Sequence, residues 1–133
     1  MKKKYLAKII AKDNHGLQVV SACCAGAKIK INDVKYLPRS KIFLLSLVRF
    51  SRENDKIDLK INSICKFEFV DTVKSKNIDQ NNRDLVLELI AIDLLKKNEK
   101  YEINLMFSKD ACIILSTEII EVTLEDQNQN LND

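Results

Sequence analysis

The sequence has little of what many catalytic and metal-binding proteins need. It holds 2 glycines, 1 proline, 1 histidine and no tryptophan in 133 residues. One histidine excludes sites with several histidine ligands, and Gly16 and Gly26 stand in no phosphate-binding loop of the GxGxxG or GxxxxGK type. These absences predict no metal, no cofactor and no catalytic residue. They do not favour an enzyme, although they do not exclude one.

Long apolar runs are missing as well. A membrane-spanning helix needs about 18 or more apolar residues in a row, and no segment of this sequence approaches that length. The lysines within Met1–Tyr5 could begin a signal peptide, but the apolar stretch that follows, Leu6–Ala11, is short and is interrupted by Lys8. We therefore expect a cytoplasmic protein that does not bind membranes.

The cysteines form no metal or redox motif. No CxxC is present, and on a helix the adjacent Cys23 and Cys24 would diverge by about 100°, so they cannot hold one ion together. His15 would lie about 12 Å from Cys23 along a helix, which is too far for a nucleophile and its base. Cys24 lies on the apolar face of the expected helix, and Cys65 and Cys112 lie in apolar strands. We predict reduced, buried and unreactive thiols.

Charge is distributed unevenly along the chain. Residues 1–76 hold 17 Lys/Arg and 7 Asp/Glu, net +10, whereas residues 77–133 hold 5 and 12, net −7. One interpretation is that basic and acidic strands lie side by side and neutralise each other across a sheet. The other is a separate basic face for an anionic partner.

The length is that of one domain. The segment Val34–Phe50 is predicted to form a hairpin at the centre of the hydrophobic core. Pro38 fixes its own φ and begins a turn over Pro38–Lys41, so that both flanks are extended. The second flank is apolar on both faces, and we therefore predict a central strand that is covered on each side.

A single short helix is expected before this hairpin. Asp13 or Asn14 can cap its first turn, and Gly26 can end it in the left-handed conformation. Four residues at helical spacing, Leu17, Val20, Ser21 and Cys24, would form its buried face.

The rest of the chain predicts strands and turns. Ser51–Lys60 is highly charged and is expected to be a connection, and a strand follows with Cys65, Phe67, Phe69 and Val73 inward and a bulge at Val70-Asp71. Leu85–Leu95 fits a strand or a helix, and we favour the strand. The other expected strands are Lys4–Ala11, Lys28–Ile31, Tyr101–Phe107, Ala111–Leu115 and a last one around Ile120–Glu125.

Together these patterns predict an α+β fold over residues 1–126, followed by a polar, disordered tail over residues 127–133. One short N-terminal helix would pack on a largely antiparallel, curved sheet of about six or seven strands, as a roll or a partly open barrel.

The best candidate surface for an anion or a partner is a group of basic residues around the hairpin, together with Lys74 and Lys76 from a later strand. RNA-binding sheets also expose aromatic rings for base stacking, but the phenylalanines here are explained by the core, and Tyr36 alone is expected to be free. The alternative is a solvated lysine fringe that protects edge strands from aggregation. The candidate residues are Lys28, Lys30, Lys35, Arg39, Lys41, Lys74 and Lys76.

Several of these segments resemble one known family. They are Leu17–Ala22, Tyr36-Leu37-Pro38 with Phe43 and Arg49-Phe50, Val73–Asp79, Leu105–Ser108, and Ile119-Ile120-Glu121 with Leu124. This pattern resembles the alphaproteobacterial family called domain of unknown function 2948. The sequence departs from the family pattern at Ala25-Gly26, Val48 and Arg52, where the family has Gln-Asp, Asn and Trp. The resemblance implies a bacterial cytoplasmic protein and no known activity.

We therefore expect a non-enzymatic protein-binding or assembly module that acts through a protein partner. The alternative is a module that binds RNA or another polyanion through the basic residues named above.

Overall fold

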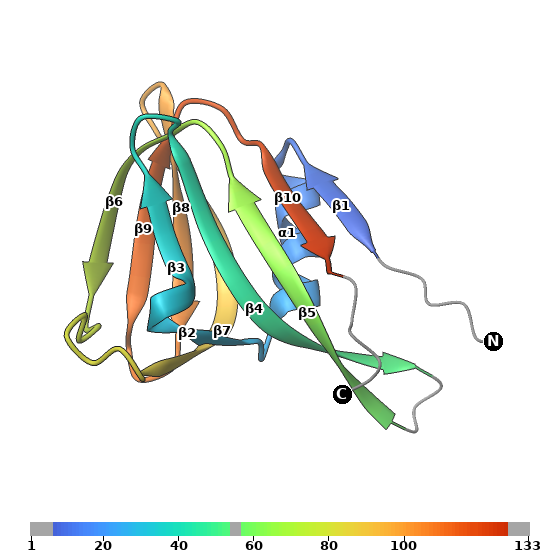
Figure 1. The fold of residues 1–133 in the computed structure, drawn as a ribbon. Coiled ribbons are helices and arrows are strands. Elements are labelled where there is room, and N and C mark those ends of the chain that lie inside the picture. The colour runs from blue at the N-terminus through green and yellow to red at the C-terminus, as the bar shows by residue number, and fades with distance from the viewer. Residues whose placement is uncertain (1–6, 54–56, 128–133) are drawn as a thin grey trace.

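The computed structural model describes residues 7–53 and 57–127. Within them, one α-helix packs on ten strands that form a single antiparallel sheet (Figure 1). The sheet order is β1-β10-β5-β4-β2-β7-β8-β9-β6, and β3 pairs with β4 beside this path. The elements are β1 (Lys8–Ala11), α1 (Asn14–Cys24), β2 (Lys28–Lys30), the 3-10 helix η1 (Ile31–Asp33), β3 (Val34–Leu37), β4 (Ile42–Glu53), β5 (Ile57–Phe67), β6 (Val70–Lys76), β7 (Val86–Lys97), β8 (Lys100–Phe107), β9 (Cys112–Thr117) and β10 (Val122–Asp126).

The helix forms as the sequence predicts. The Asp13 side chain accepts a hydrogen bond from the Gly16 amide at 2.8 Å, which caps the first turn. After the last turn Gly26 has φ +83, a conformation that costs a glycine little. α1 packs on β1, β4 and β7. Its buried residues are the predicted Leu17, Val20, Ser21 and Cys24.

The central hairpin is also confirmed. The Lys41 amide bonds to the Pro38 carbonyl at 3.3 Å, and β4 then runs between β5 on one side and β2 and β3 on the other. Leu45 is fully buried, and the rings of Phe43 and Phe67 pack with their centroids 6.0 Å apart. The prediction that both faces of β4 are covered is wrong, because Ser46 on the opposite face is exposed. The helix covers only the inner face of the sheet.

Two expectations around β5 are wrong. The charged segment Ser51–Lys60 is largely strand, because the β4–β5 ladder continues without a break to the pair Glu53 and Ile57. A backbone ladder needs no apolar side chains, so the composition was a poor guide. Residues 54–56 lie outside the described part of the chain.

Phe69 does not point inward. Its φ is +60 and it is 42% exposed, because the chain turns a corner there between β5 and β6. Val70 is buried in its place, and the pairing of β6 with β9 shifts between Val70 and Thr72, where a bulge was expected. This corner divides one expected strand into two, which contributes to a count of ten instead of six or seven.

The second half of the chain follows the prediction. β7 is a strand and not a helix, and it pairs with β8 and β2. A shift in its ladder between Leu89 and Ala91 leaves the Ile92 amide to bond to Ser21 Oγ at 2.9 Å, which ties α1 to the sheet. The β8–β9 hairpin and β10 are present.

The sheet curves but does not close into a barrel. β1 forms one edge and β6 the other, and β6 returns towards β3 without forming a ladder with it. One backbone bond of 2.8 Å joins the Val70 amide to the Lys41 carbonyl at the end where these strands approach (Figure 1). The gap between β3 and β6 is therefore lined by two strand edges that have no ladder partner among the described strands.

No helix in residues 7–53 and 57–127 is long and apolar enough to cross a membrane. Residues 1–6, which hold the whole lysine segment Met1–Tyr5 and the start of the expected strand Lys4–Ala11, lie outside the described part. So do residues 128–133 of the expected tail.

Candidate functional site

A buried ion pair joins the middle of the sheet to its β1 edge. Arg49 Nε and Nη2 donate to Asp126 Oδ1 and Oδ2 at 3.0 and 2.8 Å. Ser63 Oγ donates to Oδ1 at 2.6 Å and the Ala7 amide to Oδ2 at 2.9 Å. The two charged side chains are 10% and 1% exposed. Each oxygen of the Asp126 carboxylate therefore accepts two hydrogen bonds, as a buried charge requires.

Burial raises the pKa of Asp126, but the hydrogen bonds from Arg49, Ser63 and the Ala7 amide outweigh it and hold that pKa below its ordinary value. Sequence reasoning did not include Arg49 among the candidate basic residues, and it missed this partner. A signal was present, since Arg49 and Asp126 each continue the buried alternation of an apolar strand. Two opposite charges in phase with the core are typical of a buried pair.

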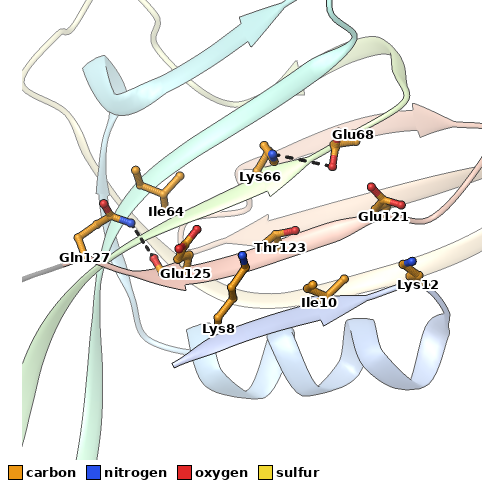
Figure 2. A pocket seen from close by; sticks show the side chains of 10 residues that line it. All are labelled: Lys8, Ile10, Lys12, Ile64, Lys66, Glu68, Glu121, Thr123, Glu125 and Gln127. Atoms are coloured by element: carbon orange, nitrogen blue, oxygen red, sulfur yellow. Dashed lines mark hydrogen bonds and ion pairs between the residues drawn. The ribbon is translucent and has the colours of Figure 1, made fainter. Parts of the chain in front are cut away.

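A shallow groove of about 500 Å³ crosses the outer face of β1, β10 and β5 (Figure 2). We call it the outer groove. Ile10 and Ile64 contribute apolar surface, and Thr123 lies between them in the view. Its charged residues are balanced in sign: Lys8, Lys12 and Lys66 against Glu68, Glu121 and Glu125.

These charges lie close to residues of opposite sign. Lys8 is opposite Glu125 in the ladder, and Lys66 Nζ is 3.9 Å from Glu68 Oε2. Partial burial raises the pKa of Glu68, and a hydrogen bond with Glu121 raises it further. Sequence reasoning missed this carboxylate pair because its members are far apart in the chain and only the β5–β10 pairing brings them together. The equal number of lysines and glutamates in the outer groove, with Lys8 opposite Glu125 across the β1–β10 ladder, fits the interpretation in which basic and acidic strands neutralise each other.

The structure divides the predicted basic residues into two groups. Lys28 and Lys30 line a recess between β2, β4 and β5, where Lys28 Nζ pairs with Glu88 at 2.6 Å. The others lie on β3, on the turn after it and on β6. Of these, Lys41 Nζ pairs with Asp71 at 3.1 Å, and its pKa is raised by that hydrogen bond. Lys35, Arg39, Lys74 and Lys76 make no ion pair within the described residues.

Between β3 and β6 lies a recess of about 540 Å³. We call this recess, with the two strand edges that face it, the seam. Its apolar lining comes from Val34 and Tyr36 on β3, Phe43 on β4, Val73 on β6 and Ile113 on β9. The remaining lining residues are two more apolar side chains, Ile31 and Ile78, and four polar ones, Asn32, Ser75, Gln80 and Arg83.

Tyr36 is not the free ring that the sequence suggested. Its hydroxyl donates to the Val70 carbonyl at 2.8 Å and lies 3.0 Å from the Asp71 carbonyl. It therefore bridges β3 and β6 at the narrow end of the seam. Sequence reasoning identified the basic residues around the seam but missed the recess, because that recess depends on how the sheet curves.

The thiols give mixed outcomes. Burial raises the pKa of Cys24 to about 12, and it raises the pKa of Cys65 strongly, so both are poor nucleophiles. Cys112 is only half-buried, and the prediction that it is enclosed in the core is wrong because its side chain lies on the outer face of β9. No group of three or more His, Cys, Asp or Glu side chains in the described ranges is arranged to hold a metal ion.

Comparison with known proteins identifies one relationship. The family model described as Protein of unknown function (DUF2948) matches residues 7–132. No curated protein and no solved structure matches the sequence. Because the family model covers nearly the whole chain, the protein belongs to the DUF2948 family.

Proposed function

We propose that this protein is a non-enzymatic protein-binding module and that the seam is its binding surface. The observation that carries the proposal is the pair of strand edges, β3 and β6, which face each other across an apolar-lined recess without forming a ladder. An unpaired edge presents a row of backbone donors and acceptors that another chain can pair with. Addition of a partner strand to such an edge is a recurrent mode of peptide recognition.

Binding of RNA or another polyanion is the second candidate. It is favoured by Lys35, Arg39, Lys74 and Lys76, which make no ion pair among the described residues. The aromatic side chains do not favour it, because base stacking needs several exposed rings and Phe69 is the one phenylalanine in the described residues that is exposed, at 42%. Phe43 and Phe67 are buried, and Tyr36 is engaged with the backbone of β6.

The test compares two tryptophan variants that fill two different recesses. Ser75→Trp would fill the seam, since Ser75 is exposed and lines it. Thr123→Trp is the matched control, because Thr123 lines the outer groove. Circular dichroism would establish that both variants fold, and wild-type and variant proteins would be used to capture partners from a native lysate. Each captured protein would then be purified and titrated against the three forms.

We expect a protein partner that binds wild type and Thr123→Trp and loses affinity at least tenfold with Ser75→Trp. Equal binding by all three forms would contradict the assignment to the seam. Submicromolar binding of a mixed-sequence RNA, falling steeply with salt as condensed counterions are released, would favour the second candidate.

A further inference from the structure

The strand edge, the side-chain pattern and the charges of the seam indicate which kind of partner segment would fit it. Resting on the proposed function, we infer that the partner supplies an acidic, extended polypeptide segment, which adds to β6 as a further strand. The inference concerns the chemistry of the segment and the edge to which it binds. It follows from three features: the length of the free edge, the alternation of its side chains and the charges that flank it.

The free edge is long enough for specific pairing. β6 spans Val70–Lys76, and all its ladder pairing within the described strands is with β9. On its other side a backbone bond from Val70 reaches the Lys41 carbonyl, and Tyr36 covers the carbonyls of Val70 and Asp71. These contacts occupy only the first residues of β6. The edge from Thr72 to Lys76 is left to accept a strand.

Side chains on β6 alternate between two environments. Val73 and Ser75 line the recess, whereas Lys74 and Lys76 are exposed, as the twofold period of a strand requires. A strand paired with β6 would alternate in the same way. Its inward side chains would contact Val34, Val73 and the other apolar residues of the recess, and its outward side chains would lie beside the two lysines.

The basic residues around the seam indicate that the partner segment is acidic. Lys35, Lys74, Lys76 and Arg83 lie on the two strands and on the loop that borders the seam, and none makes an ion pair in the described part of the chain. No Asp or Glu is among the described residues that line the recess, and two acidic side chains near it already have partners. Asp71 is held by Lys41 at 3.1 Å and Lys100 at 3.4 Å, and Asp79 accepts a bond from the Asn81 amide. Acidic side chains on the added strand would complement the unpaired cations.

The experiment uses synthetic peptides and the full-length protein. The probes are fluorescein-labelled short peptides in which Glu alternates with Val, Leu or Thr, and a matched set in which Lys replaces Glu. A third set carries N-methylated backbone amides, which cannot donate to a strand edge. Binding is measured by fluorescence anisotropy at low and high salt. A mixed-sequence single-stranded RNA is titrated in parallel.

Two charge-neutralised variants test the edge. Lys74→Gln with Lys76→Gln removes two cations from β6, and Lys8→Gln with Lys12→Gln removes two from the β1 side of the sheet. All four lysines are exposed, so both double variants should fold, which circular dichroism checks. We expect the acidic peptides to bind wild type, and affinity to fall about fivefold to tenfold in the β6 variant and less than twofold in the β1 variant. The Lys and N-methylated peptides should bind at least tenfold more weakly.

Equal binding of Glu and Lys peptides, or equal loss in both double variants, would overturn the inference. So would failure of every peptide, or RNA binding tighter than peptide binding. If the peptides fail while a captured protein still distinguishes Ser75→Trp from Thr123→Trp, the proposed function stands and only the inference about the acidic strand is lost. If both experiments fail, the seam is not a binding surface.

Discussion

The two edges of this sheet are built differently. At β1 a strand of four residues is backed by α1, and the buried cluster of Arg49, Asp126 and Ser63 holds the adjoining chain through the Ala7 amide. At β6 a strand of seven residues borders an open recess, and a single backbone bond at Val70 joins it to the β3–β4 turn. Both β1 and β6 are end strands with one unpaired side, but the β1 end is fastened by buried charges and the β6 end borders an open recess.

Charge follows the same division. On the β1 side, lysines and glutamates line the outer groove in equal number. On the β6 side, Lys74 and Lys76 make no ion pair among the described residues. The comparison teaches that the charge asymmetry of the sequence has two roles. Part of it is neutralised between strands, and Lys74 and Lys76 lie beside the β6 edge without an ion pair among the described residues.

The strongest test of the fastened edge is removal of one buried charge. We predict that Arg49→Ala destabilises the protein by about 3–5 kcal/mol, because it leaves the Asp126 carboxylate buried without its ion-pair partner. Chemical denaturation measures the loss. The double variant Arg49→Met with Asp126→Leu should lower the free energy of unfolding by less than the sum of the losses in Arg49→Met alone and Asp126→Leu alone. The reason is that the double variant leaves no buried charge unpaired. A loss below about 1 kcal/mol for Arg49→Ala would mean that the cluster does not fasten this edge.

A core change in the central strand β4 comes next. Leu45→Ala should destabilise by about 2–5 kcal/mol, because Leu45 is 0% exposed and the cavity can collapse only in part. Leu44→Ala is the matched control, since Leu44 is the neighbouring residue on the partly exposed face of β4. Equal losses in the two variants would show that the faces of β4 are not as different as the structure indicates.

The core positions illustrate how much the sequence predicts. Local patterns identified the helix, its cap as Asp13 or Asn14, and most of the strands, because each depends on neighbouring residues. It failed at Phe69, where a left-handed corner reverses the side-chain direction, and along Ser51–Lys60, where backbone pairing alone extends two strands. These features depend on the tertiary ladder, which local pattern does not encode.

The site was predicted only in part, for a related reason. The sequence indicated Lys35, Arg39, Lys74 and Lys76 as basic residues near the hairpin. It could not indicate that β6 returns to face β3, because that approach follows from the accumulated curvature of the whole sheet. The recess and the carboxylate pair Glu68 and Glu121 were missed for the same reason.

Acid should weaken the fastened edge. The pKa of Asp126 is below its ordinary value in the folded protein, so its contribution to stability is fully present above the unfolded pKa and is lost as pH falls through the folded pKa. We predict a decrease in the free energy of unfolding below about pH 5 that high salt hardly changes, because the pair is buried. The pKa of Asp71 is lowered by its hydrogen bond to Lys41, and Asp71→Asn is the surface control.

Denaturation of wild type, Asp126→Asn and Asp71→Asn across this pH range, at low and high salt, checks the prediction. The slope should be flattened in Asp126→Asn at both salt concentrations. If Asp126→Asn keeps the full slope of wild type, the buried carboxylate is not its source.

The reactivity of the cysteine thiols tests the same contrast, between the buried core and the β6 side of the sheet, without altering the stability of the protein. Cys65 and Cys24 lie in the core, and burial raises the pKa of each, so we expect neither to react with a thiol reagent until the protein unfolds. Cys112 lies opposite Lys76 in the β6–β9 ladder and is half-buried, so it should react in the native state. Mass spectrometry of the labelled protein identifies the site. Rapid native labelling of Cys65 would contradict the described core.

The most direct test of the central claim is amide hydrogen exchange at both edges, with and without a bound partner. The account predicts that a partner slows exchange in β6 from Thr72 to Lys76 and leaves exchange in β1 unchanged, because the added strand pairs with the free edge beside the seam. Protection confined to β1 or the outer groove, with β6 exchanging as in the free protein, would contradict it.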